Sequence, residues 1–169
     1  KDFINLPNLS RSINDLGQFS KVKQLPIISD ILEALHIHSD ADYFIYTNVD
    51  IGLMPFFYEE VARLLKSHDA LVINRRTIAP CYDSELPLSQ CFSQVGEIHP
   101  GFDCFIFPRE LFNNYYFADT VAGANWIGRV FIVNLLAYAT SFKILEDAHL
   151  TFHFGDDRSW KTVENIPFD

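Results

Sequence analysis

Apolar residues along this chain alternate between runs with helical spacing and short continuous runs that are typical of buried strands. The first helical run begins at Pro26, and proline is favoured in the first turn of a helix. Its apolar positions recur three and four residues apart: Leu25, Ile28, Ile31, Leu32 and Leu35. An aromatic and β-branched run from Tyr43 to Thr47 follows and predicts a buried strand.

The next two segments repeat this order. A second amphipathic helix is predicted over 55–66, with acidic residues early and a lysine late, as the helix dipole favours. The apolar segment 70–74 predicts a second buried strand. A strand, a helix and a strand within about 35 residues are typical of a βαβ unit. The sequence therefore predicts an α/β fold with a parallel sheet.

The second half of the chain adds more elements of both kinds. Apolar strands are predicted over 103–107, 142–145 and 149–154. A short helical turn is predicted over 108–112, and a longer helix over 126–140. Because the longer helix is apolar nearly all round, we expect it to be buried.

One long segment, 75–101, contains several prolines and glycines and predicts a loop with a helix at 86–95. The polar end of the chain, 158–169, also predicts a loop. No internal repeat, low-complexity tract or linker interrupts the pattern. We therefore expect a single α/β domain over residues 1–169.

The composition is consistent with a folded protein and limits the classes of ligand that it can bind. Of the 169 residues, 49% are hydrophobic and 21% are charged, so a packed core is expected. The net charge of −9 excludes general nucleic-acid binding, which needs a basic surface. An acidic protein that binds an anionic ligand needs a cation to bridge the two. Neither a GxxxxGK[ST] nor a GxGxxG motif is present, and without GxSxG a serine hydrolase is unsupported.

Three cysteines, Cys81, Cys91 and Cys104, form no CxxC pair, and their number is odd. Structural zinc and a disulfide framework are therefore disfavoured, and we expect buried thiols in a reducing, cytoplasmic compartment. No apolar run approaches the roughly 18 residues of a membrane span, and no signal peptide is visible. The chain begins at Lys1, and its only methionine is Met54, so we expect a fragment of a longer protein.

The first candidate site is the polar corner that ends the strand at Thr47. Asn48 and Asp50 are two positions apart, so in an extended segment both side chains point to the same side. They can then meet one cation or one ribose-diphosphate, and ligands bind at the carboxyl ends of strands in open α/β sheets. The alternative is an ordinary turn, because Asn and Asp often end strands by bonding their own backbone.

Two histidines, His149 and His153, fall in the last predicted strand. In a regular strand they would lie on one face, roughly 13 Å apart, so they cannot share a metal. His153 is the better candidate ligand because it precedes the corner at Gly155, and a neutral imidazole suits manganese-class and zinc-class ions. The alternative is a hydrogen-bonded histidine without a metal.

Further candidates stand at the starts of two elements. Asp103 opens a strand, where a carboxylate can act as a general base or bind sugar hydroxyls, or can simply cap a loop. Asn125 and Trp126 precede a helix, and an aromatic face can stack on a sugar or a base. Arg129, one turn later, can reach a phosphate or a carboxylate. The alternative for Asn125, Trp126 and Arg129 is helix capping and core packing.

Four segments together resemble a known family. DYFIYTNVDIGLMPFFY, HPGFDCFIFPRELF, GANWIGR and EDAHLTFHFGDD, in this order, are similar to a family of glycosyltransferase-like proteins with the GT-A fold. The similarity extends from about Leu25 to Trp160. It implies a Rossmann-related, mixed but mainly parallel sheet flanked by helices. Proteins of this type have a βαβ segment before the strand that leads into the corner, and no convincing first strand is visible before that strand here. Either the N-terminal part of such a domain is missing, or the fold is reduced.

The resemblance also assigns roles to residues. Proteins of this type hold a divalent cation, Mn²⁺ or Mg²⁺, with a DxD-type motif, and here Asn48-Val49-Asp50 stands in its place. Asp50 and His153 would then be metal ligands, and Asp103 the catalytic or acceptor-binding acid. The nucleotide sugar would be bound by residues at the corner and at the helix start: Thr47, Asn48, Asp50, Asn125, Trp126 and Arg129.

Two positions depart from the family pattern. Asn48 replaces the first acid of the motif, and Val133 stands where relatives carry an acid after the Gly-Arg pair. The first hypothesis is a metal-assisted transferase that moves a sugar from a nucleotide-diphospho-sugar to a hydroxyl of a glycan or another acceptor. The second is a degenerate, non-catalytic module that binds a glycan or a protein partner. The third is a metal-dependent phosphohydrolase that uses Asp50 and His153.

Overall fold

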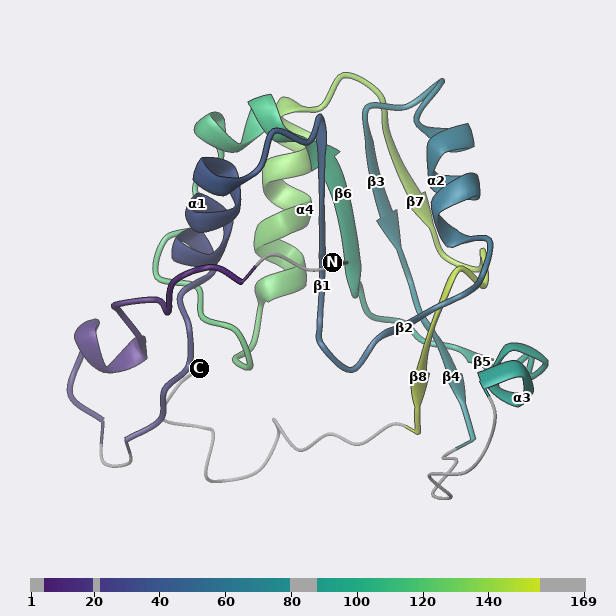
Figure 1. Ribbon diagram of the computed structural model, residues 1–169, viewed down its shortest axis with the longest axis horizontal. Helices are drawn as coiled ribbons and strands as arrows, with labels where there is room; N and C mark the ends of the chain where they lie inside the picture. Colours follow the sequence, from purple (N-terminus) through teal and green to yellow (C-terminus); the bar gives the residue numbers. More distant parts are fainter. Residues whose placement is uncertain (1–4, 20–21, 80–87, 156–169) are drawn as a thin grey trace.

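The computed structural model describes residues 5–19, 22–79 and 88–155, and these form a mixed α/β structure with two four-stranded sheets (Figure 1). The predicted loop over 158–169 lies outside the described residues, as does Cys81. The described helices include none that is long and apolar enough to cross a membrane.

The main sheet has the strand order β1-β6-β3-β7. Its strands are β1 (Tyr43–Thr47), β6 (Cys104–Pro108), β3 (Ala70–Ile73) and β7 (Phe142–Leu145). β6 is antiparallel to both of its neighbours, β1 and β3, while β3 and β7 are parallel. Three strands therefore run in one direction and β6 in the other. The prediction of a mainly parallel sheet was wrong, because β6 lies between β1 and β3 and makes two of the three ladders in this sheet antiparallel.

The second sheet is smaller and has the order β2-β8-β4-β5. Its strands are β2 (Gly52–Leu53), β8 (Thr151–Phe154), β4 (Arg76–Ile78) and β5 (Glu97–Ile98). β8 is parallel to β4 and antiparallel to β2. Strand β8 begins two residues later than the predicted strand over 149–154. The reason is that His149 has a positive φ of 48°, which extended strands do not adopt. The predicted loop over 75–101 contains two strands of this sheet.

The α-helices occur close to the predicted segments. They are α1 (Ile28–His38), α2 (Phe57–Leu64), α3 (Leu88–Phe92) and α4 (Ile127–Tyr138). Two short 3₁₀ helices are also present, η1 (Ile13–Asp15) and η2 (Arg109–Asn114). Of the predicted helix over 86–95, the described residues contain α3, which ends at Phe92, three residues before the predicted end.

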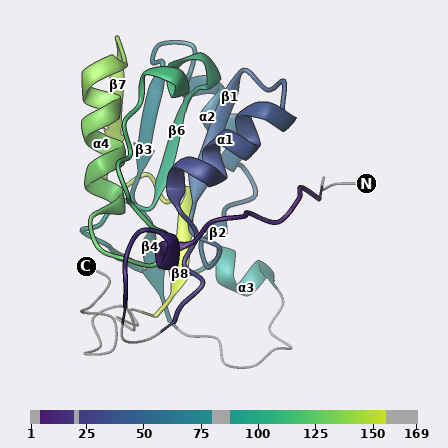
Figure 2. The same cartoon turned by 90° about the vertical axis from the view of Figure 1, so that its left-hand side faces the viewer.

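Helices cover both faces of the main sheet. Figure 1 shows α1 and α4 on one side and α2 on the other, and Figure 2 looks onto the side of α1 and α4. Alternation along the strands sorts their residues between two apolar cores. One core lies under α1 and α4 and is largely aromatic, with Phe44, Phe105, Phe107, Phe117 and Phe131. The other lies under α2 and contains Phe57, Val61, Leu71, Ile73, Cys104 and Ile106.

Helix α4 is not buried all round, contrary to the prediction. Phe131 and Leu135 are fully buried, whereas Val133 and Leu136 on its other face are 64% and 62% exposed. The helix packs against one sheet, so only one side of it can be covered.

The two described cysteines, Cys91 and Cys104, are buried thiols outside any disulfide. Burial raises the pKa of the Cys104 thiol to about 12. A buried thiol with so high a pKa is almost entirely protonated at neutral pH and is therefore unreactive.

Phe131 of α4 joins the helix to the sheet, and we expect its removal to be costly. Its ring stacks on Phe105 at 4.5 Å between centroids and on Tyr46 at 4.7 Å. Phe131→Ala should lower the free energy of unfolding by about 3–5 kcal/mol, because it leaves a cavity in the aromatic core. Urea unfolding followed by circular dichroism measures this change. The control is Val133→Ala on the exposed face of the same helix, which should change stability by less than about 0.5 kcal/mol.

Candidate functional site

Polar residues extend three adjacent strands of the main sheet, β1, β6 and β3, at one end. Thr47 and Ile73 both pair with Cys104, so the next positions outward are Asn48, Asp103 and Asn74. By alternation these positions belong to the face that α1 and α4 cover. The hydroxyl of Thr47 donates a hydrogen bond to the carbonyl oxygen of Asp103 at 3.0 Å, which ties the end of β1 to the start of β6.

Asp50 and His153 come together beside this end of the sheet. The amide of Ile51 donates to the carbonyl oxygen of Asn48 at 3.2 Å, which closes a tight turn around Asp50. The Nε2 atom of His153 lies 3.2 Å from Oδ2 of Asp50, and the other ring nitrogen, Nδ1, donates to the carbonyl oxygen of Gly155 at 2.8 Å. The imidazole is largely buried, whereas the Asp50 side chain is 59% exposed. The His153 imidazole is thus held in place, and the Asp50 carboxylate faces solvent.

The hydrogen bond to Gly155 determines what Nε2 can do. Because Nδ1 carries the donated proton, Nε2 of a neutral His153 presents a lone pair toward the Asp50 carboxylate. A hydrogen atom shared between the two atoms, or a cation bound by both, can join them at this distance. Adjacent ligands of an octahedral ion such as Mg²⁺ are roughly 3 Å apart, so this pair fits two coordination positions.

A complete protein-built metal site is not seen. Residues 5–19, 22–79 and 88–155 contain no group of three or more His, Cys, Asp or Glu side chains that could hold a metal. Asp50 and His153 would supply two ligands to a divalent cation. Water or the oxygens of a phosphate-bearing ligand would complete the coordination sphere, as is usual for Mg²⁺.

Asp103 is buried and paired with a residue that the sequence did not point to. Nη1 of Arg75 donates to Oδ1 of Asp103 at 3.0 Å, and both side chains are about nine-tenths buried. Burial raises the pKa of the Asp103 carboxyl, while the nearby Arg75, His99 and His153 oppose that shift and Asp50 adds to it. The other carboxylate oxygen, Oδ2, is buried and has no hydrogen-bond partner among the described residues.

Trp126 and Arg129 form a separate pair at the start of α4. The guanidinium carbon of Arg129 lies 4.2 Å from the centroid of the Trp126 ring, a cation–π contact. Trp126 is 56% exposed and has a φ of 75°, so it neither fills the core nor caps the helix with its side chain. The core-packing alternative is therefore wrong for Trp126.

The start of α4 lies at the same end of the sheet as Asp103. A Cβ atom at Gly128 would sit 3.2 Å from the carbonyl oxygen of Phe102, so the first turn of the helix packs on the residue before Asp103. Figure 1 shows this turn at the end of the sheet where β1 stops and β6 begins. Within the described part of the chain, no contact joins Trp126 or Arg129 directly to Asp50 or His153.

His149 is not part of this cluster. It lies before β8 and faces Arg76 and Asp147, and burial lowers its pKa. His153 alone of the two reaches Asp50.

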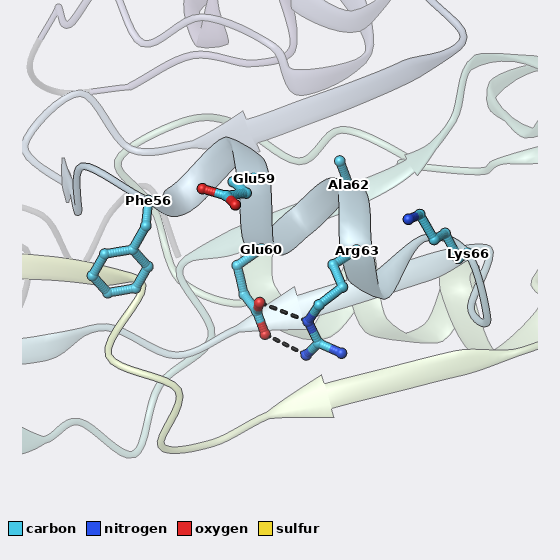
Figure 3. Close-up of a pocket in the computed structure, with 6 residues that line it drawn as sticks. All are labelled: Phe56, Glu59, Glu60, Ala62, Arg63 and Lys66. Atoms are coloured by element: carbon cyan, nitrogen blue, oxygen red, sulfur yellow. Dashed lines mark hydrogen bonds and ion pairs between the residues drawn. The ribbon is translucent and has the colours of Figure 1, made fainter.

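Two surface hollows lie away from the corner. One runs along the solvent-facing side of α2, and Figure 3 shows that Glu60 and Arg63 form an ion pair there, with Nε donating to Oε2 at 2.7 Å. The other lies near the beginning of β1 and includes His36, Asp69 and Arg109. Neither is lined by any of the predicted site residues.

Comparison of the chain with protein-family models, with curated proteins and with solved structures finds no match.

The raised pKa of Asp103 makes a prediction about stability and pH. A carboxyl whose pKa is higher in the folded state than in the unfolded state favours folding most when it is protonated. Its contribution is therefore complete below the unfolded value of about 3.9 and is lost as the pH rises through the folded value. We expect the wild type to lose stability relative to Asp103→Asn as the pH rises from roughly 3.5 to roughly 7. Urea unfolding at a series of pH values measures this difference. A difference that is constant over this range would contradict the shift.

Proposed function

We propose that this chain is a glycosyltransferase domain that transfers a sugar from a nucleotide-diphospho-sugar to an acceptor hydroxyl with the help of a divalent cation. The observation that carries the proposal is the contact between Asp50 and His153 at the end of the main sheet. A carboxylate and the unprotonated nitrogen of a fixed imidazole are suitable ligands for Mn²⁺ or Mg²⁺. An acidic protein with a net charge of −9 also needs such a cation to bind a diphosphate.

When bound, the cation would supply Lewis-acid stabilisation of the negative charge that develops on the leaving diphosphate. Asp50 and His153 would hold it, and the hydrogen bond to Gly155 keeps the imidazole in the required tautomer. The exposed side chain of Asn48 would contact the ribose or a metal-bound water. Thr47 keeps the corner in place through its bond to the backbone of Asp103.

The remaining candidates would bind the organic parts of the donor and the acceptor. The exposed ring of Trp126 offers a face on which a base or a sugar can stack, and Arg129 beside it carries a positive charge suited to a phosphate. Asn125 precedes them and would add a polar contact. Asp103 would accept the hydrogen of the acceptor hydroxyl, from a glycan or another hydroxyl compound.

The two departures from the family pattern differ in weight. Val133 is 64% exposed on the outer face of α4, so an acid at this position would point away from Asp103 and the corner. Its absence therefore does not weaken the proposal. Asn48 stands in the corner itself and leaves one carboxylate where a DxD motif has two. That substitution supports the second candidate, a non-catalytic module that binds the same ligand class without turnover.

The proposal predicts cation-dependent binding of a nucleotide sugar. Isothermal calorimetry with UDP-, GDP- and dTDP-glucose should show binding in the presence of Mn²⁺ that is lost on its removal. Asp50→Ala should weaken this binding by at least about tenfold, because it removes a metal ligand. Glu59→Ala, which removes an exposed acid on α2, is the matched control and should bind as the wild type does.

Three outcomes separate the candidate functions. Binding together with release or transfer of the sugar supports the transferase, and binding without turnover supports the non-catalytic module. Release of inorganic phosphate from a nucleotide without an acceptor would indicate the phosphohydrolase. If no binding is detected with the nucleotide sugar at millimolar concentration and Mn²⁺ present, the proposal is contradicted.

Trp126 is expected to contribute to binding and not to folding, because its ring is exposed. Trp126→Ala should weaken binding of the nucleotide sugar by about 1–3 kcal/mol, the usual value of stacking between a base and an aromatic ring. The melting temperature should not change. Tyr58→Ala removes an exposed aromatic side chain from α2 and should leave the calorimetric affinity unaltered. Equal affinities for the two variants would exclude Trp126 from the ligand site.

A further inference from the structure

Arg75 and Asp103 form a buried ion pair at the junction of the two sheets. Arg75 stands between β3, which ends at Ile73, and β4, which begins at Arg76. Its Nη1 atom donates to Oδ1 of Asp103 at 3.0 Å, and the two side chains are only 10% and 9% exposed. The pair thus lies at the end of the main sheet that carries the corner, within the electrostatic influence of Asp50 and His153.

Stability alone does not account for this pair. Removing two charges from water is costly, and an apolar pair of similar volume often stabilises a fold equally well or better. The arrangement carries further costs, because Oδ2 of Asp103 and Oδ1 of the neighbouring Asn74 are both buried without a hydrogen-bond partner in the described residues. Each unsatisfied acceptor opposes folding. A purely structural ion pair would be expected to satisfy both oxygens of its carboxylate.

We propose that Arg75 is a positioning residue that holds one oxygen of Asp103 and leaves the other, Oδ2, without a hydrogen-bond partner in the described part of the chain, so that it can accept the proton of an acceptor hydroxyl once the turn at 99–101 moves aside. This inference rests on the proposed transferase function. The hydroxyl oxygen forms a bond to the anomeric carbon, and the bond from that carbon to the diphosphate breaks, with its electron pair going to the diphosphate. The hydroxyl proton goes to Oδ2. Arg75 touches neither reactant and acts through the orientation and charge of Asp103.

The turn at 99–101 covers this oxygen. A Cβ atom at Gly101 would lie 3.8 Å from Oδ2 of Asp103, which is an ordinary contact distance, and 2.6 Å from Nε2 of His99, so the turn packs beside this oxygen and against the His99 ring. The turn is joined to β3 and the junction by two long hydrogen bonds, from the amide of His99 to the carbonyl of Arg75 at 3.3 Å and from Asn74 Nδ2 to the carbonyl of His99 at 3.4 Å. Oδ2 is buried in this structure, so the inference includes a shift of this turn that admits the hydroxyl.

The experiment measures release of free sugar from UDP-, GDP- or dTDP-glucose with Mn²⁺ present and water as the acceptor. Arg75→Met should lower kcat by about 100-fold, within the usual range for loss of a general base, and leave KM within about twofold. Arg75→Lys keeps the charge and should restore most of the lost kcat. A merely structural role would not produce this split between kcat and KM or this rescue. Unchanged kcat in Arg75→Met would overturn the inference.

A second variant distinguishes a loss of activity from a loss of folding. Arg75→Met combined with Asp103→Leu removes both charges of the pair, so neither of these two charges is left buried without the other. A melting temperature at or above that of the wild type, together with loss of sugar release, supports a functional role for the pair. A melting temperature well below the wild type assigns the pair to structure and overturns the inference. No sugar release by the wild type from any donor overturns the transferase proposal itself, whereas release that Arg75→Met leaves unchanged overturns only the role of Arg75.

Discussion

The pairing of β6 with β1 on one side and β3 on the other is the constraint on which the candidate site depends. Both ladders meet at Cys104, so the residue before it, Asp103, falls between the polar ends of the two neighbouring strands. The same pairing brings Thr47 within hydrogen-bond distance of the Asp103 backbone. A shift of either ladder by one residue would turn Asp103 to the α2 face and separate it from the first turn of α4.

Stability and chemistry are concentrated in different parts of the main sheet. Its middle is apolar on both faces, with stacked aromatic rings under α1 and α4 and aliphatic packing under α2. The end that carries the corner contains a buried ion pair, two unsatisfied acceptors and an imidazole that faces a carboxylate. The unsatisfied acceptors cost free energy of folding, and a buried ion pair often stabilises a fold no more than an apolar pair would. The apolar middle offsets that cost, which is the usual relation between a core and a functional edge.

Much of the local structure could be predicted from the sequence, because strands and helices follow from the spacing of neighbouring apolar residues. The run from Tyr43 to Thr47 is strand β1 within the predicted limits, and 103–107 corresponds to β6. The predictions were wrong where a contact between distant residues, or a single backbone angle, determines the secondary structure or the burial. Segment 75–101 was expected to be a loop, yet its ends pair as β4 and β5. Helix α4 was expected to be buried, yet the single sheet beneath it leaves Val133 exposed.

The sequence by itself determined the elements, the polar corner and the ligand types at Asp50 and His153, because these are properties of residues and their immediate neighbours. Only the tertiary structure decided that Asp50 meets His153 and that Asp103 is held by Arg75. It also placed Trp126 and Arg129 beside the same sheet end without contact to the corner in the described residues. These relations join residues far apart in the chain, and they depend on strand order and ladder register, which local spacing does not specify.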